Sequence, residues 1–274
     1  MTHAKTVYRT LLAAALLGAS LSHTATAAQP PENLVAAGKL TYGTAATFAP
    51  FEYQQDGKLT GFDIELGELI SQRLGLQAAP FNVEFRGLIP ALQGKRIDLI
   101  NSAMYINDER SAQVDFVPYL RIGSEVVVAK GNPKGISGRE DVCGQRIAVT
   151  LGGIEESRAR DDVTRCQGED RTPPTIVTFP TAQASAMALR VGRADVLYTS
   201  TPGAAVLMRE VPDTYETSGP TFEADTRLGL AVRKGDTELA AALEEALGQI
   251  VASGDYLRLI HAYQLPDSAA LLEQ

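Results

Sequence analysis

Histidine is scarce in this sequence, and the common motifs of nucleotide binding and hydrolysis are missing. Of the 3 histidines in 274 residues, only His261 follows residue 27. One histidine cannot form a histidine metal cluster, and it allows at most one Ser–His or Cys–His nucleophilic pair. No GxGxxG, GK[ST] or GxSxG motif occurs either. We therefore predict no metal, no cofactor and no catalytic residues, and expect His261 on the surface or in packing.

Runs of positive charge are also absent. The chain has 25 Lys and Arg against 33 Asp and Glu, a formal charge of -8, and no Lys or Arg block longer than a dipeptide. Phosphate backbones and anionic lipid surfaces are recognised by such basic patches, so nucleic acid is not an expected partner. With 45% hydrophobic and 21% charged side chains, the composition is that of an ordinary globular protein.

Residues 1–27 have the features of a cleaved secretory signal. Lys5 and Arg9 form a positive start, residues 11–21 are apolar, and residues 25–27 are small. The apolar run is too short to span a bilayer, which disfavours the alternative of a membrane anchor. No cysteine stands at the expected cleavage point, so a lipid anchor is not expected.

Cys143 and Cys166 are the only cysteines in the chain. An even number of cysteines in an exported protein favours a disulfide over a metal site or a nucleophile. We therefore predict a bridge between them that has a structural role.

Short β-rich segments alternate with helical periodicity along the chain. The pattern predicts strands at 40–44, 82–85, 97–101, 125–129, 146–150, 175–179, 196–198 and 228–232, and helices at 62–74, 88–93, 155–165, 182–191, 239–251 and 256–263. Such alternation predicts an α/β fold whose mostly parallel sheets carry helices on both faces.

Several motifs in the first half of the chain stand in a characteristic order. They are TFAPFEY at 47–53, GKLTGFDIEL at 57–66, GLIPALQGKRIDLI at 87–100, NDER at 107–110 and VDF at 114–116. With these motifs the chain resembles the periplasmic solute-binding proteins of polar amino-acid ABC importers, the extracellular solute-binding protein family 3. The resemblance covers essentially the whole chain after the signal.

The resemblance implies a two-lobed periplasmic binding protein (type II) fold with two crossing hinge strands. Residues 28–123 and 223–274 would form lobe 1, and residues 124–222 would form lobe 2. A ligand would be held in the cleft between the lobes and released to a membrane permease. The resemblance also implies a periplasmic location, and nothing in the sequence indicates more than a monomer.

The resemblance assigns roles to residues of lobe 1. Arg110 matches the arginine that grips the ligand carboxylate, a task for which a planar guanidinium is suited. Phe48 and Phe85 match two aromatics that enclose the ligand side chain. A surface salt bridge for Arg110 and a core position for either ring are the alternatives.

A second group of matched residues lies between these motifs and in lobe 2. Ser102 and Ala103 stand where the family offers polar backbone groups and a hydroxyl, and Tyr105 stands where a small Ser or Thr is usual. Thr150, Gly153 and Ile154 match a strand, glycine turn and helix start whose free N–H groups meet the carboxylate. A plain strand-to-helix turn is the alternative for this segment.

Two acidic positions of the family are not acidic here. Ala45 replaces a frequent Asp in lobe 1, and Ser200 replaces the Asp that faces the ligand ammonium in lobe 2. Because an unpaired buried ammonium is costly, an α-amino acid would need another anion, such as Glu52 or Glu155. The departures favour a carboxylate whose nitrogen is secondary, cyclic, quaternary or absent, such as an opine or a betaine.

Three functional classes follow from this sequence. The preferred one is the binding component of an ABC importer, which closes on an amino acid, a modified amino acid or another small carboxylate. The second is a periplasmic cyclohexadienyl dehydratase, an enzyme on the same fold, for which Glu155 and Glu156 are the only acids near the cleft. The third is a sensor that reports its ligand to a separate membrane receptor.

Overall fold

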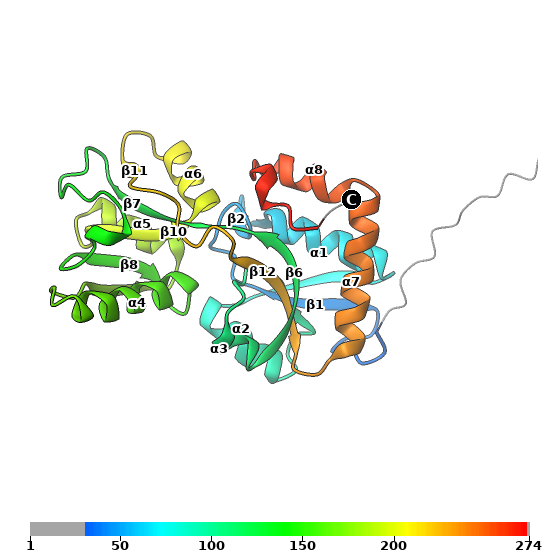
Figure 1. Cartoon of the computed structure of the whole chain (residues 1–274). Coiled ribbons are helices and arrows are strands. Elements are labelled where there is room, and N and C mark those ends of the chain that lie inside the picture. The colour runs from blue at the N-terminus through cyan, green and yellow to red at the C-terminus, as the bar shows by residue number, and fades with distance from the viewer. Residues whose placement is uncertain (1–30, 273–274) are drawn as a thin grey trace, which may run out of the picture.

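The computed structural model describes residues 31–272, so the predicted signal lies outside the described residues. Two five-stranded sheets lie side by side, each flanked by its own helices (Figure 1). We call the body around the first sheet lobe 1 and the body around the second sheet lobe 2. The predicted α/β class is confirmed.

Lobe 1 is built from both ends of the described chain. Its sheet has the order β4 (Gln77–Asn82), β1 (Lys39–Thr44), β5 (Leu99–Ile100), β12 (Arg227–Arg233) and β6 (Val114–Arg121). A hairpin of β2 (Tyr53–Gln55) and β3 (Lys58–Thr60) stands beside it. Its helices are α1 (Phe62–Arg73), α2 (Leu88–Gln93), α3 (Asp108–Ser111), α7 (Thr237–Ala252) and α8 (Asp255–Ala262), with 3-10 turns at Phe85–Gly87 and Asp267–Ala269.

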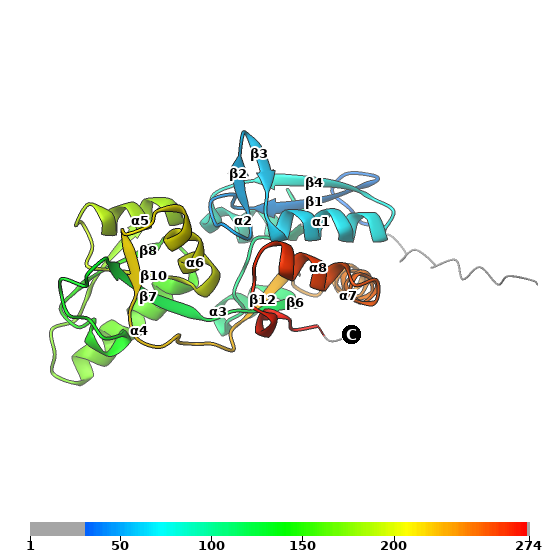
Figure 2. The same cartoon turned by 90° about the horizontal axis from the view of Figure 1, so that it is seen from above.

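Lobe 2 is formed by one continuous stretch of chain. Its sheet has the order β11 (Tyr215–Thr217), β7 (Ser124–Ala129), β10 (Val196–Ser200), β8 (Arg146–Thr150) and β9 (Thr175–Phe179). Its helices are α4 (Ile154–Gly168), α5 (Ala182–Arg190) and α6 (Thr201–Glu210), with a 3-10 turn at Arg139–Asp141. Figure 2 shows the two lobes from above, with α4, α5 and α6 around the second sheet.

The sheets are mixed, where mostly parallel sheets were predicted. In lobe 1, β1 pairs in parallel with β4 and β5, whereas β12 pairs antiparallel with β5 and β6. In lobe 2, β8 pairs in parallel with β9 and β10, whereas β7 pairs antiparallel with β10 and β11. Each antiparallel pair of these two sheets contains β7 or β12, the strands that follow the two connections between the lobes. The path of the chain between the lobes therefore sets the direction of these strands.

The predicted strand at 82–85 was wrong by several residues, and strand β6 was missed. The observed β4 ends at Asn82 and contains Pro80, and β6 contains Pro118. Both strands lie at an edge of the sheet, where a proline without an N–H is tolerated. Their residues are less continuously buried than those of the neighbouring strands β1 and β12, so the sequence pattern is weaker there.

Two chain segments connect the lobes and run side by side. The first passes from β6 through residues 122–123 into β7, and the second returns through residues 222–227. Ser124 pairs with Phe222, Arg121 pairs with Arg227, and the Ile122 amide donates to the Thr226 carbonyl at 2.8 Å. Figure 1 shows both connections between the lobes.

A buried arginine of lobe 2 ties these two connections together. Arg158 of α4, 5% exposed, donates from Nη1 to the Ser124 hydroxyl and from Nη2 to the Thr226 hydroxyl, the latter at 2.7 Å. Its guanidinium also lies 5.3 Å from the ring centroid of Tyr105 in lobe 1. The helix that starts at the cleft is therefore anchored at the crossing of the lobes.

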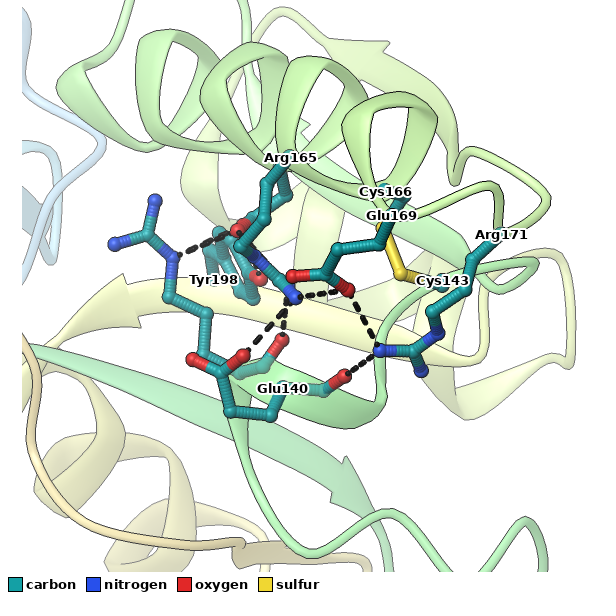
Figure 3. Close-up of a disulfide and its surroundings, with 9 residues drawn as sticks. Glu140, Cys143, Arg165, Cys166, Glu169, Arg171 and Tyr198 are labelled. Carbon is teal, nitrogen blue, oxygen red and sulfur yellow. Dashed lines mark hydrogen bonds and ion pairs between the residues drawn. A yellow bond between two sulfur atoms is a disulfide. The ribbon is translucent and has the colours of Figure 1, made fainter.

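The predicted disulfide is present in lobe 2. Cys143 follows the 3-10 turn and is bonded to Cys166 of α4, with the two Cα atoms 5.8 Å apart (Figure 3). Arg165 lies beside it and pairs with Glu140 at 3.0 Å, while Arg171 pairs with Glu169 at 3.2 Å. The bridge and these ion pairs hold the loop before β8 against the outer part of α4.

Within residues 31–272, no helix is both long enough and apolar enough to span a membrane.

Candidate functional site

A cavity lies where the carboxyl ends of strands from both sheets face each other. In lobe 1 its walls come from the segments after β1, β4 and β5, and in lobe 2 from those after β8 and β9. The lining residues are Ala45, Thr47, Phe48, Glu52, Phe85, Ala103, Tyr105, Thr150, Gly153, Ile154, Glu155 and Ala182. A second hollow shares Thr47, Phe48, Thr150, Glu155 and Ala182 with it and extends toward α5 and α6. Ligands of α/β folds commonly bind at such strand ends.

Most of the residues predicted for the site are brought together there. Eight of them line the cavity: Phe48, Glu52, Phe85, Ala103, Tyr105, Thr150, Gly153 and Ile154. Ser102 is fully buried behind Glu52, Arg110 lies beside the cavity, and Ser200 is buried at the start of α6.

Arg110 is buried at the junction of the two lobes and makes no surface salt bridge. Its side chain is 7% exposed, and no carboxylate of the described residues lies within ion-pair distance. Nη1 donates to the Tyr105 carbonyl at 2.6 Å, and Nη2 donates across the cleft to the Gly152 carbonyl at 2.9 Å. Burial lowers the pKa of Arg110, which still carries a positive charge at neutral pH. A buried cation without a paired anion is suited to receive a carboxylate.

The aromatic rings have different surroundings. Phe48 is half-buried and lies 5.3 Å from Phe51, centroid to centroid. The Phe85 ring lies 5.4 Å from the Arg110 guanidinium, so it supports that side chain as well as lining the cavity. Tyr105 is 3% exposed, with its ring against Arg158, and therefore forms part of the cavity floor. It is a third aromatic ring in the lining of the cavity, beside Phe48 and Phe85.

Glu52 and Asp63 form a buried pair of carboxyl groups beneath the cavity. Both side chains are fully buried. Gly61 makes this approach possible, because its φ is +126° and a Cβ there would lie 2.2 Å from the Phe51 carbonyl oxygen. The amide of Asp63 donates to that same carbonyl at 2.9 Å, which fixes the start of α1 beside Glu52.

The two carboxyl groups share one proton. Burial and the charge of Asp63 raise the pKa of Glu52 well above its ordinary value, and burial raises the pKa of Asp63 from 3.8 to about 6. Asp63 accepts from the Tyr119 hydroxyl at 2.8 Å and from the Ala103 amide at 2.5 Å, whereas Oε2 of Glu52 has no donor among the described residues. Glu52 therefore keeps the proton and Asp63 carries the charge.

We expect the Glu52→Gln substitution to change how stability depends on pH. Because burial raises the pKa of Glu52 well above its value in the unfolded chain, the contribution of its proton to the free energy of unfolding is fully present below about pH 4 and is lost as pH rises toward the folded pKa. An amide at position 52 donates to Asp63 without a titrating proton, so this loss is largely removed. The free energy of unfolding of the variant, relative to that of the native protein, should rise by about 1–3 kcal/mol from pH 4 to pH 8, as measured by urea unfolding.

The exposed Glu68 of α1 provides the control for this experiment. Glu68→Gln removes one carboxyl from the same helix and should leave the difference from the native protein independent of pH. A pH-independent difference for Glu52→Gln as well would show that the pair shares no proton.

Asp63 also fixes the backbone that follows β5. Ala103 has a φ of +34°, a strained value for a residue with a side chain, and its amide is held by the Asp63 carboxylate. The neighbouring Ser102 accepts from the Ala45 amide at 2.9 Å and donates to Oε1 of Glu52 at 2.8 Å. Ser102 and Ala103 are thus positioned through buried acids that lie behind the cavity wall.

The wall of lobe 2 is the first turn of α4. Gly153 precedes this helix without a side-chain cap, and the first N–H groups of a helix have no acceptor within it. Glu156 turns back to accept from the Gly152 amide at 2.8 Å and pairs with Arg160. Glu155 lines the cavity, is 7% exposed, and has an oxygen, Oε1, without a hydrogen-bond partner among the described residues.

The two positions that lack the expected acids have ordinary structural surroundings. Ala45 is buried and lines the cavity. The Ser200 hydroxyl accepts from the Gly203 amide at 3.0 Å and caps α6. Neither residue brings negative charge to the site.

Three groups that shape the site were missed by the sequence interpretation. Asp63 lies within a recognised motif, but nothing in the sequence indicates that this acid is fully buried. In the sequence Arg158 does not differ from the other charged residues of α4. Thr47 belongs to a motif of which only Phe48 and Glu52 were predicted to bind the ligand. Within residues 31–272 no cluster of three or more His, Cys, Asp or Glu side chains is arranged to hold a metal ion.

Comparison with known proteins gives one family for the chain. Residues 40–265 match the bacterial extracellular solute-binding proteins, family 3. The L-cystine-binding protein TcyJ of Escherichia coli (strain K12) is 32% identical over 219 residues, which cover 79% of this chain and 79% of that protein. The arginine-binding protein ArgT of Corynebacterium glutamicum is 29% identical over 256 residues, which cover 90% and 82%.

Solved structures show the same relationship. An ancestral arginine-binding protein bound to arginine is 33% identical, with a TM-score of 0.77, over 82% of this chain and 98% of that one. An ancestral amino acid-binding protein, described as a precursor of cyclohexadienyl dehydratase, is 31% identical, with a TM-score of 0.74, over 82% and 95%.

Proposed function

Because the chain belongs to the bacterial extracellular solute-binding proteins, family 3, we propose that it binds an amino acid or a related small carboxylate between its lobes and delivers it to an ABC importer. The observation that carries the proposal is Arg110, a buried cation without a carboxylate partner at the junction of the lobes. The rings of Phe48, Phe85 and Tyr105 beside it supply apolar surface for the rest of a ligand. Closure of the lobes would signal the bound state to the permease.

We propose the same division of the chain that the sequence suggested, with residues 28–123 and 223–274 in lobe 1 and 124–222 in lobe 2. The change from one sheet to the other between Arg121 and Ser124, and the bridge of Ser124 to Phe222, support these boundaries. We further propose that residues 1–27 direct export to the periplasm and are removed. The mature protein works as a monomer whose partner is a separate permease.

A thermal-shift screen of the protein without residues 1–27, refolded to remove carried-over ligand, tests the proposed function. A ligand at about a thousand times its Kd adds on the order of 4 kcal/mol, or about 8–16 °C for a chain of this size. We expect one class to give such a shift among arginine, cystine, histidine, glutamine, opines, betaines and dicarboxylates. If none of these compounds changes the melting temperature, the proposed function is wrong.

A dehydratase is the second candidate, and Glu155 is the observation that favours it. Burial raises the pKa of this carboxyl, which lines the cavity, and a protonated acid there could donate to a leaving hydroxyl. The same screen therefore includes prephenate, whose consumption is followed by absorbance. We expect no turnover, and measurable turnover that Glu155→Gln abolishes would establish the enzyme instead.

A further inference from the structure

We propose that Glu155 recognises the α-ammonium group of the ligand, in place of the acid that is missing at Ser200. The inference rests on the proposed function and names its substrate class, which is an α-amino acid with a free primary ammonium. It assigns the specificity for this group to the first turn of α4 rather than to the start of α6.

One carboxyl oxygen of Glu155 is buried without a partner in the described part of the chain. Glu155 is 7% exposed, and Oε1 accepts no hydrogen bond from any described residue. A buried polar group that lacks a partner is costly, and native structures retain few of them. Glu155 lines both the cavity and the hollow beside it, so a ligand in either contacts this residue.

Glu155 differs from the adjacent acid, Glu156, in its contacts. Glu156 stands in the same helical turn, but its two oxygens are taken up by the Gly152 amide and by Arg160. Glu156 thus serves the turn that precedes α4. The carboxyl of Glu155 has a hydrogen bond from its own backbone amide, but Oε1 has no partner among the described residues and remains to be satisfied by a donor.

Glu155 forms no ion pair with a neighbouring arginine of the described residues. The two buried arginines nearby, Arg110 and Arg158, have their hydrogen bonds with other groups. Arg110 donates to the carbonyls of Tyr105 and Gly152, and Arg158 donates to the hydroxyls of Ser124 and Thr226. Neither lies within 4.0 Å of a Glu155 oxygen, so neither arginine forms an ion pair with Glu155.

The placement relative to Arg110 fits an α-amino acid. Arg110 donates to Gly152, two residues before the α4 turn that carries Glu155, so a carboxylate at Arg110 lies near this turn. An α-ammonium is only one carbon from its carboxylate. Ser200 is neutral and caps α6, whereas Glu155 can supply the full negative charge that an ammonium requires.

Proton release provides an independent readout of this contact. Burial raises the pKa of Glu155, opposed by the charges of Arg158 on the same helix and Arg110 on α3, while Tyr105 and Glu52 face the cavity from lobe 1. An ammonium beside Glu155 favours the ionised form of the carboxyl. Binding should therefore release a proton at pH values below the pKa that Glu155 has in the protein without ligand. Affinity should accordingly rise with pH in that range.

The experiment compares matched ligands on matched variants by calorimetry. The probes are L-arginine with 5-guanidinopentanoic acid, and L-glutamine with its analogue lacking the amine. For the amino acid that binds, we expect Glu155→Gln to raise Kd about 10- to 100-fold and to abolish proton release. The analogue without the amine should change less than about threefold. Asp161→Asn, an exposed acid on the same helix, should leave both values unchanged.

The outcomes separate this inference from the proposed function. If Glu155→Gln raises the Kd of both ligands equally and leaves proton release unaltered, Glu155 is a structural residue. Tight binding of an analogue without the amine, or of only a betaine or opine, would overturn the ammonium contact. In each of these cases binding of a small carboxylate survives, whereas the absence of any bound carboxylate overturns both. Thermal unfolding without ligand verifies that the variants are folded, and Glu155→Ala repeats the test.

Discussion

Replacing Arg110 by alanine is expected to weaken binding of the ligand by about 30- to 5,000-fold. The guanidinium is buried and can offer a carboxylate two charge-assisted hydrogen bonds, and the loss of one partner of such a pair costs about 2–5 kcal/mol. Calorimetric titration of the most strongly stabilising compound from the screen measures the effect. The loss should appear for every carboxylate that binds, because this contact does not depend on the side chain of the ligand.

Two further variants make the Arg110 experiment specific. Arg110→Lys keeps the charge but not the planar fork, so it should recover only part of the affinity. Arg258→Ala removes an exposed arginine of lobe 1 that pairs with Asp255 far from the cavity, and it should bind like the native protein. A loss of less than about threefold for Arg110→Ala would mean that the carboxylate is held elsewhere, for example by the free amides of α4.

Removal of the disulfide has the largest expected effect on stability. Cys143 and Cys166 are 23 residues apart, and closing a loop of this size restricts the unfolded chain by about 3 kcal/mol. The double substitution to serine should therefore lower the melting temperature by about 6–12 °C. Ligand affinity should change little at a temperature where the variant is folded, because neither cysteine lines the cavity.

The ion pairs around the bridge provide the control. Arg171 and Glu169 are 43% and 42% exposed, and such pairs contribute about 0–1 kcal/mol. Arg171→Ala should therefore shift the melting temperature by no more than a few degrees. If the double serine variant melts as the native protein does, the loop is held by the packing of α4 alone.

Elements with a regular local pattern were predictable, even at the edge of a sheet. Strands 146–150 and 175–179 and helix 88–93 agree with the structure to the residue, although 175–179 is the edge strand β9. Strands β4 and β6 each contain a proline, which weakens their pattern. The direction of β12 depends on the path between the lobes, which no local pattern encodes.

The site was predictable in its parts but not in its electrostatics. Motifs located the segments that meet at the strand ends, since the order of the chain largely fixes which loops share an edge. Whether an acid is buried, paired or free depends on packing from distant segments. Thus the motif containing Asp63 gave no sign of its proton-sharing partner, and two adjacent glutamates, Glu155 and Glu156, could not be told apart.

The prediction about the ligand nitrogen depends on the same electrostatics. The neutral Ala45 and Ser200 favoured a ligand without a primary ammonium, and an α-amino acid was expected to need another anion, such as Glu52 or Glu155. Both of these acids line the cavity. Which of them is charged beside a ligand depends on burial by distant segments, which the aligned positions do not encode.

The hydrogen bond from Arg110 to Gly152 joins the two walls of the cleft through groups of the protein itself. Such a contact favours the closed arrangement by the same amount whichever compound is bound. It therefore multiplies all dissociation constants by one common factor and leaves their ratios unchanged. Affinity and selectivity can then evolve separately in this protein, the first through contacts between the lobes and the second through the residues that face the ligand.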